Sequence, residues 1–231
     1  MKDVVIIHYN TQELTSAAIR SLIKQTPDCK ITVFDNSDRR PFDKMGNPRI
    51  NVIDNTRGQV VDFERWLSSF PDKAPSPENN YASAKHCKSV DCCFDLFPSG
   101  FVLMDSDVLV RQDISRFFDP DYAWIGQVKM HKSRYGIRLP RVLPFLCWLN
   151  VPLLRNHGVR YCDDQKMWSL SNRRPDMGYD TGCWFYEDAC TKHLPFKSLG
   201  IEHYILHLGH ASWRDRDAGQ WLEENKDLWT T

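Results

Sequence analysis

Short apolar runs alternate with segments of helical periodicity along the first half of the chain. The runs are rich in valine and isoleucine and cover residues 3–8, 30–35, 50–54 and 101–105. Continuous apolar runs, in contrast to an alternation of apolar and polar residues, are typical of parallel strands buried on both faces. The pattern therefore predicts βαβ units with right-handed crossovers, and an α/β fold with an open, mostly parallel sheet flanked by helices.

Three segments between the predicted strands carry apolar residues at helical spacing. The first follows Asn10, whose side chain we expect to cap the helix together with Glu13. The second covers residues 60–70 and the third residues 81–97, and the proline-rich stretch 71–80 between them predicts a loop. The helices therefore fill the connections that a parallel sheet requires.

The second half of the chain is less regular. Residues 123–130 and 203–210 have the composition of strands. Residues 138–162 are rich in proline, leucine and aromatic residues, and we expect them to pack over the sheet. The alternative for this segment is an apolar face that meets a lipid-linked acceptor.

The charge balance gives no support for a nucleic-acid partner. Lysine and arginine total 30, as do aspartate and glutamate, so the formal net charge is zero with histidine neutral. No run reaches the roughly 20 apolar residues of a membrane helix. The first residues lack the apolar region of a secretory signal, and the eight cysteines form no C-x-x-C pair. We expect a cytoplasmic chain with reduced thiols, whose membrane contact, if any, is peripheral to the inner face.

Polar residues follow each of the four predicted parallel strands. They are His8, Tyr9 and Asn10 after the first strand, Asp35 and Asn36 after the second, Asn55 after the third, and Asp105, Ser106 and Asp107 after the fourth. In an open parallel sheet, ligands bind just outside the carboxyl ends of the strands. Turn formation explains any one of these ends, but four in succession predict a shared polar ligand site.

The fourth run carries two carboxylates, Asp105 and Asp107, directly after an apolar strand. On an extended chain, residues two apart point the same way and lie ~6–7 Å apart. At ~6 Å and an effective dielectric constant near 20, two such charges repel by ~3 kcal/mol. A divalent cation turns this repulsion into attraction, and carboxylates suit Mn²⁺ and Mg²⁺. The D-x-D pair therefore predicts a metal site.

The histidines near residue 207 and the acidic residues after residue 179 extend the predicted site. On a strand, His203 and His207 share a face, and imidazole binds Mn²⁺ beside carboxylates. Asp180, Glu187 and Asp188 lie among aromatic residues, which suit sugar rings, and a carboxylate can take a proton from a sugar hydroxyl. We therefore treat His207 as a metal ligand, and the three acidic residues as candidates for the catalytic base.

The order of these motifs resembles that of nucleotide-sugar-dependent glycosyltransferases of the GT-A fold, and among them the family 2 group of inverting bacterial enzymes. The stretches that carry the resemblance are VVIIHYNTQELTSAAIRSL, ITVFDNSD, NVIDNTRG, FVLMDSDV and HLGHAS. The chain departs from the family where Ile7 and His8 replace the usual Pro-Thr. The stretch between the third and fourth strands is also longer than in the family.

The resemblance implies one Rossmann-like GT-A domain over residues 1–231. Residues 1–110 would form its nucleotide-sugar-binding half, and residues 111–231 a less regular acceptor-binding half. It further implies that Tyr9 and Asp35 contact the base and ribose of the donor, and that Lys85 approaches the nucleotide. Asp105 would lie near the ribose or the metal.

The function implied by the resemblance is metal-dependent transfer of a sugar from a nucleotide-diphosphate sugar, with a UDP-sugar expected, to a glycan or a lipid-linked glycan. A role in surface polysaccharide or lipopolysaccharide synthesis is expected at the level of the family. In this mechanism Asp188 or Asp180 deprotonates the acceptor, Asp107 binds Mn²⁺ or Mg²⁺, and the anomeric centre is inverted. A retaining transferase, a metal-dependent phosphohydrolase and a sugar-binding domain without catalysis remain alternatives.

Overall fold

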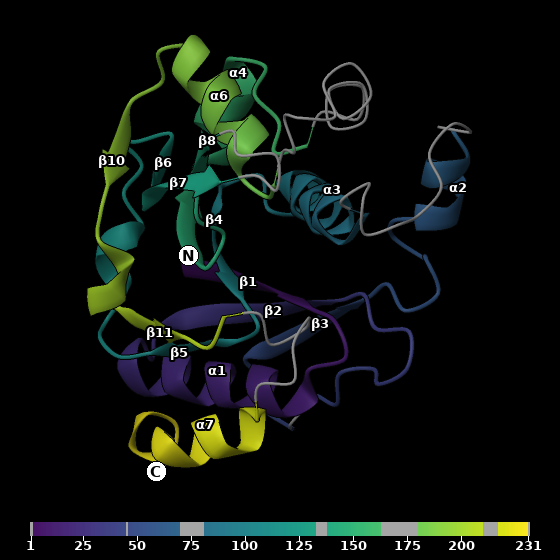
Figure 1. Ribbon diagram of the computed structural model, residues 1–231, viewed down its shortest axis with the longest axis vertical. Helices are drawn as coiled ribbons and strands as arrows, with labels where there is room; N and C mark the ends of the chain where they lie inside the picture. The colour runs from purple at the N-terminus through teal and green to yellow at the C-terminus, as the bar shows by residue number, and fades with distance from the viewer. Residues whose placement is uncertain are drawn as a thin grey trace.

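The computed structural model describes residues 2–44, 46–69, 81–132, 138–162, 180–209 and 217–230. Its centre is a seven-stranded sheet in the order β10-β6-β9-β4-β1-β2-β3 (Figure 1). In chain order the strands of this sheet are β1 (Lys2–His8), β2 (Cys29–Asp35), β3 (Ile50–Asp54), β4 (Phe101–Asp105), β6 (Trp124–Gly126), β9 (Leu146–Leu149) and β10 (Phe196–Ser198). The four apolar runs of the first half all become strands, as predicted.

The sheet is mostly parallel. Strand β1 pairs in parallel with β2 and β4, and β2 pairs in parallel with β3. Strand β9 is antiparallel to both β4 and β6, and the edge strand β10 is parallel to β6. An open, mostly parallel α/β sheet is therefore confirmed, and strands from both predicted halves of the chain share it.

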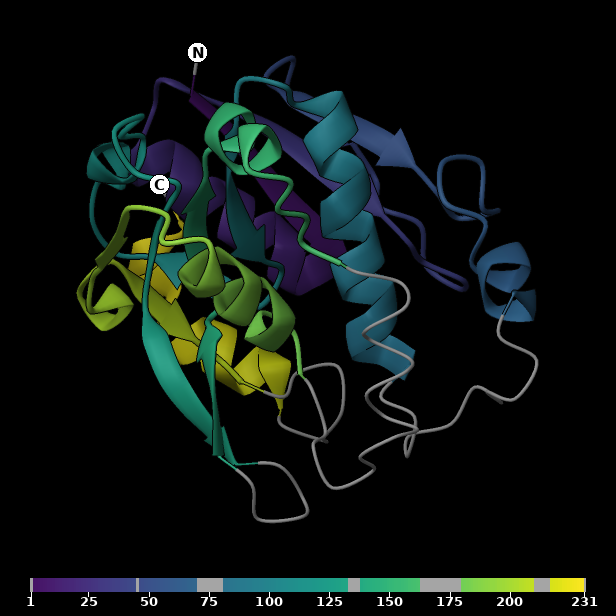
Figure 2. The ribbon, with the colours of Figure 1, turned by 90° about the horizontal axis from the view of Figure 1, so that it is seen from above.

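Helices cover both faces of the sheet, in layers that Figure 1 shows from the side. The helices are α1 (Gln12–Gln25), α2 (Phe63–Ser68), α3 (Tyr81–Leu96), α4 (Val151–Asn156), α6 (Cys183–Thr191) and α7 (Ala218–Glu224), with 3-10 turns η2 (Ser115–Phe117), η3 (Ile201–His203) and η4 (Lys226–Leu228). Helices α3, α4 and α6 lie on one face, and α1 lies on the other with α7 outside it. Figure 2 shows α3 and α1 from above, on opposite sides of the strands.

The residues of β1 show why the apolar runs lack alternation. Val5 and Ile7 belong to the apolar cluster that includes residues of α3, whereas Val4 and Ile6 belong to the cluster that includes residues of α1. Every position of this strand from Val4 onward is buried, because a helix layer meets each face. A strand of this kind needs apolar side chains on both sides.

The predicted cap of the first helix is wrong. Helix α1 begins at Gln12, so Thr11 occupies the position that precedes it. Asn10 instead adopts a left-handed backbone conformation, with φ of 56°, and its Oδ1 accepts hydrogen bonds from the backbone N–H groups of Arg39 and Arg40. Asn10 therefore ties the turn after β1 to the loop after β2. The predicted loop at 71–80 lies outside the described residues.

The second half of the chain adds two small antiparallel pairs. Strand β5 (Val108–Val110) pairs with β11 (Ile205–His207), and β7 (Val128–Lys132) pairs with β8 (Arg138–Val142). The predicted strand at 123–130 is thus divided at Gln127 between the main sheet and the β7–β8 hairpin. The strand predicted at 203–210 is shorter, since His203 lies in η3 and is exposed.

The apolar segment after residue 138 belongs to the core. Strand β9 is buried in the main sheet, with Leu146, Cys147 and Leu149 fully covered. Strand β9 therefore offers no apolar face to a lipid-linked acceptor, because its side chains are buried. Among the described helices, none has the length and apolarity that crossing a membrane requires.

Candidate active site

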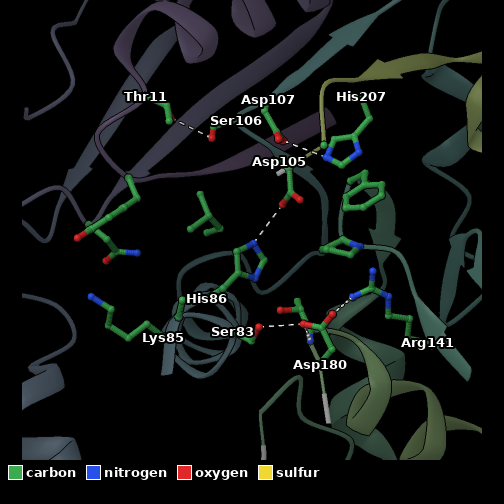
Figure 3. Close-up of a pocket in the computed structure, with 18 residues that line it drawn as sticks. Thr11, Ser83, Lys85, His86, Asp105, Ser106, Asp107, Arg141, Asp180 and His207 are labelled. Atoms are coloured by element: carbon green, nitrogen blue, oxygen red, sulfur yellow. Dashed lines mark hydrogen bonds and ion pairs between the residues drawn. The ribbon is translucent and has the colours of Figure 1, made fainter. Parts of the chain in front are cut away.

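The polar ends of the parallel strands lie side by side at one edge of the sheet. In the register of the sheet, His8 pairs with Asp35, Asp35 pairs with Asp54, and Ile7 pairs with Asp105. A cavity of about 720 Å³ opens at this edge, and both carboxylates of the D-x-D pair line it (Figure 3). The position is the one expected for a ligand in an open α/β sheet.

Three side chains in the cavity converge on one point. Single ligand atoms of Asp105, Asp107 and His207 all lie within 4.8 Å of one another. His207 Nε2 is 3.2 Å from Asp107 Oδ1. The chain turns at Ser106 and Asp107 instead of remaining extended, so the carboxylates approach more closely than the spacing along a strand indicates.

The pairing of β5 with β11 brings His207 to the carboxylates. Val108, which directly follows Asp107, lies opposite His207 in this antiparallel pair. The ring of Phe145 stacks on the His207 imidazole, with ring centroids 3.6 Å apart. The geometry therefore joins the end of β4 to a segment about a hundred residues later in the chain.

The donor atoms of this triad fit a divalent cation. Carboxylate oxygens together with one imidazole nitrogen suit Mn²⁺, and carboxylates alone suit Mg²⁺. All three side chains are partly exposed to the cavity, so water or a phosphate oxygen can complete the coordination. Asp105, Asp107 and His207 are therefore the residues that can hold a metal.

Two contacts that the sequence analysis did not identify hold the D-x-D turn. His86 Nε2 on α3 is 3.2 Å from Asp105 Oδ1. Thr11 Oγ1 donates a hydrogen bond of 3.1 Å to Ser106 Oγ. His86 lies beside Lys85, which was predicted to bind the nucleotide. Ala82, Lys85 and His86 are three and four residues apart on α3, so they share one side of the helix, and this spacing is the signal in the sequence.

A second polar group forms the side of the cavity opposite the triad (Figure 3). Asp180 Oδ1 accepts 2.8 Å hydrogen bonds from Ser83 Oγ and from the backbone N–H of Thr181. Asp180 Oδ2 accepts from Arg141 Nη1, in an ion pair that is mostly buried. Of the three predicted base candidates, Asp180 is therefore the one that lines the cavity. Ser83, Arg141 and Thr181 were not predicted to belong to the site. Ser83 and Arg141 lie 97 and 39 residues from Asp180 along the chain, so no local motif links them to it.

Tyr9, Asn36 and Lys85 line a third part of the cavity. Lys85 Nζ lies 5.1 Å from the centroid of the Tyr9 ring and 5.4 Å from that of Phe63, in cation–π geometry. Burial lowers the pKa of Lys85, and the nearby charge of Asp38 partly offsets this effect. This part of the cavity offers an aromatic face, an amide and a cation to a ligand.

Three predicted binding residues are buried and are not among those that line the cavity. His8 is fully buried, with Nδ1 2.7 Å from Thr15 Oγ1, and desolvation lowers the pKa of its imidazole. Asp35 accepts hydrogen bonds from the backbone N–H groups of Ser37 and Phe42, at 2.9 and 2.7 Å. Asn55 likewise accepts from backbone N–H groups and donates to Asn36. These side chains shape the loops at the strand ends, as Asn10 does.

Glu187 and Asp188 are not among the residues that line the cavity. Both lie on α6, where Glu187 is exposed and Asp188 is partly buried. Asp188 Oδ2 accepts a 3.0 Å hydrogen bond from Lys192 Nζ, one helical turn further along. The structure therefore does not bring the predicted E-D pair to the D-x-D carboxylates.

Comparison with solved structures identifies the fold as GT-A-like. The galactosyltransferase LgtC, solved in complex with donor and acceptor sugar analogues, matches with a TM-score of 0.59 and 15% identity, over 99% of this chain and 96% of that chain. Glycosyltransferase GlyE of Streptococcus pneumoniae TIGR4 matches with a TM-score of 0.51 and 14% identity, over 96% of this chain and 59% of that chain. Mouse xyloside xylosyltransferase 1 matches with a TM-score of 0.50 and 11% identity, over 87% and 85%.

The sequence itself matches no protein-family model and no curated protein. At identities of 11 to 15%, the structural likeness establishes the fold, and the GT-A architecture predicted from the sequence is thereby confirmed. Membership of family 2 stays a prediction.

Proposed function

We propose that this chain is a metal-dependent glycosyltransferase that moves a sugar from a nucleoside-diphosphate sugar to a hydroxyl of a glycan or lipid-linked glycan. The observation that carries the proposal is the triad of Asp105, Asp107 and His207 at the carboxyl edge of a GT-A-like sheet. The similar structures support it, because they are described as glycosyltransferases and LgtC was solved with donor and acceptor sugar analogues.

The triad would hold Mn²⁺ or Mg²⁺ against the diphosphate of the donor. A cation bound there would act as a Lewis acid that neutralises the negative charge of the diphosphate. Tyr9, Asn36 and Lys85 would bind the nucleoside, since a ring face, an amide and an ammonium group suit a base and a ribose. The donor would then extend from Tyr9 past the triad towards Asp180, across the length of the cavity.

The carboxylate of Asp180 is already engaged by other groups of the protein. Its two oxygens already accept hydrogen bonds from Ser83, Arg141 and the backbone of Thr181, so an acceptor hydroxyl finds few open lone pairs there. Apart from the D-x-D pair, Asp180 is the one carboxylate among the described residues that line the cavity. Because inversion requires a base on the far side of the sugar, this arrangement favours the retaining alternative.

Calorimetry and turnover assays test the proposed function. The full chain is titrated with UDP in the presence and absence of Mn²⁺, beside a panel of other nucleoside diphosphates. It is then incubated with the corresponding nucleotide sugars and candidate glycans. We expect Mn²⁺-dependent binding of one nucleotide and transfer to a glycan. Release of inorganic phosphate or free nucleotide, with no sugar transferred to any acceptor, would instead identify a phosphohydrolase.

The configuration of the product is a separate expected result. Because Asp180 is engaged by three donors, we expect the transferred sugar to keep the anomeric configuration that it has in the donor. Proton NMR of the first product formed, with the coupling constant of the anomeric proton as the readout, measures this directly. An inverted product would overturn this expectation, and Asp180 would then be the first residue to test as the general base.

Asp188→Asn tests whether Asp188, which does not line the cavity, takes part in sugar transfer. Asp188 contacts Lys192 on its own helix, and an i,i+4 ion pair on a helix typically contributes only about 0.3–0.5 kcal/mol. We therefore expect kcat/KM for sugar transfer within about threefold of the wild-type value, which corresponds to less than about 0.7 kcal/mol. A loss of a hundredfold or more would restore Asp188 as the catalytic base.

A further inference from the structure

His86 occupies a position in the cavity that the proposed function does not yet explain. It projects from α3 towards Asp105, and Figure 3 shows it between the metal triad and the Asp180 group. Its Nε2 lies 3.2 Å from Asp105 Oδ1, and both side chains are about four-fifths buried, with relative exposures of 20% and 19%. The contact joins a helix on one face of the sheet to the end of the central strand β4.

The chemistry of the two groups determines the direction of this hydrogen bond. An ionised carboxylate can only accept, so His86 Nε2 carries the hydrogen and donates it to Asp105. His86 Nδ1 is buried and has no hydrogen-bond partner among the described residues. Leaving a buried polar atom unpaired is unfavourable, because the atom loses its hydrogen bonds to water. Packing alone does not account for a histidine at this position, because an apolar side chain would avoid that cost.

The surroundings of Asp105 show what the hydrogen bond does. Within the described part of the chain, His86 is the one side chain that hydrogen-bonds the Asp105 carboxylate. The neighbouring positions are held separately, since Thr11 donates to Ser106 and the ring of Phe145 stacks on His207. Without His86, rotation about the side chain of Asp105 has no described hydrogen bond to restrain it.

We propose that His86 is a positioning residue for the metal site, acting through Asp105. By donating to Oδ1, it fixes the Asp105 carboxylate in the orientation that keeps a ligand atom within 4.8 Å of those of Asp107 and His207. The site is then arranged for a cation before the cation arrives. The inference rests on the proposed function, because it assumes that the triad binds a divalent metal.

The expected effect follows from the behaviour of residues that hold metal ligands in place. Loss of such a partner typically weakens metal binding about 10–100-fold. His86→Leu keeps a similar volume and removes the donor, whereas His86→Gln places an amide N–H near the former Nε2. His157→Leu is the matched control, since His157 is an exposed histidine directly after α4 whose ring contacts the Leu153 carbonyl.

The test measures the affinity of the full chain for Mn²⁺ alone, by the loss of the free-ion signal in electron paramagnetic resonance. We expect His86→Leu to raise the dissociation constant about 10–100-fold, while His86→Gln stays within about threefold of wild type. His157→Leu should leave it unchanged. In the background of Asp105→Asn, His86→Leu should add less than about a twofold further change, because coupled residues are not additive.

Three results would overturn the proposal. Wild-type affinity in His86→Leu would show that Asp105 needs no such support. An equal loss in His86→Leu and His86→Gln, or additive losses with Asp105→Asn, would indicate a role in packing that does not act through Asp105. If the wild-type chain itself binds no Mn²⁺, the proposed metal site fails and this inference fails with it, which is distinct from a failure confined to His86. Circular dichroism of each variant confirms that it is folded, and His86→Ala, which also removes the donor, carries the test if His86→Leu does not fold.

Discussion

Asp107→Asn is expected to abolish sugar transfer and to weaken the binding of Mn²⁺ and of the donor nucleotide. The substitution keeps the shape of the side chain but removes a charge that would lie against the cation. Loss of one preorganised electrostatic group typically lowers kcat on the order of 10²–10³-fold. Because Asp107 also contacts His207, at 3.2 Å, the remaining triad loses a partner as well as a ligand.

The measurement is kcat and KM at saturating Mn²⁺, together with calorimetric titration of UDP in the presence and absence of the metal. Asp121→Asn provides the matched control, because Asp121 is an exposed carboxylate outside the cavity lining. Full metal-dependent turnover by Asp107→Asn would remove the metal site from the proposed function. Loss of turnover with unchanged Mn²⁺ affinity would assign Asp107 to the substrate instead of the metal.

Gly182→Ala is expected to lower the free energy of unfolding more than any other substitution considered above. Gly182 precedes α6, with φ of +83°, a left-handed conformation that side chains other than glycine rarely adopt. A Cβ atom there would lie 2.1 Å from the carbonyl oxygen of Val142. Val142 is buried and paired within β8, so its backbone cannot move aside easily. We expect the free energy of unfolding to fall by about 4 kcal/mol or more.

The same substitution should also impair the active site, because Gly182 follows Asp180 and Thr181. Gly158→Ala separates the two effects, since Gly158 has φ of +65° but its Cβ would meet only Lys192 Nζ, at 3.8 Å. Backbone strain without a clash costs about 1–2 kcal/mol. Urea denaturation followed by circular dichroism measures both variants. Equal losses in the two would mean that α6 and β8 do not approach each other as closely as described.

Much of the fold could be predicted because it depends on local pattern. Val4 to Ile7 are apolar on both sides, which indicates a strand between two helix layers before any partner is known. Once the strands are parallel, their carboxyl ends must meet at one edge, so Asp105 could be placed near Asp35 without coordinates. The D-x-D pair, which ends that strand, was therefore found from the sequence.

Two interpretations of polar residues were limited by the same cause. The aromatic and acidic neighbours of Asp188 suggest a catalytic base, but they do not reveal in which direction its side chain points from α6. Asn10 was expected to cap a helix, since the sequence does not show that the backbone of Arg39 and Arg40 lies beside it. In both cases the sequence correctly indicates a polar environment for the side chain. Which polar groups surround it depends on the tertiary packing.

The sequence by itself determined the order of strands and helices in the first half of the chain, the parallel sheet and the acidic pair at its edge, because these follow from hydrophobic periodicity over a few residues. Only the tertiary structure decided that His207 joins the pair through β11, that His86 on α3 holds Asp105, and that Arg141 meets Asp180. These contacts join residues that are 19, 39 and 100 positions apart along the chain. These contacts form only when the helices and strands pack together. A local sequence pattern does not show toward which distant element a side chain points.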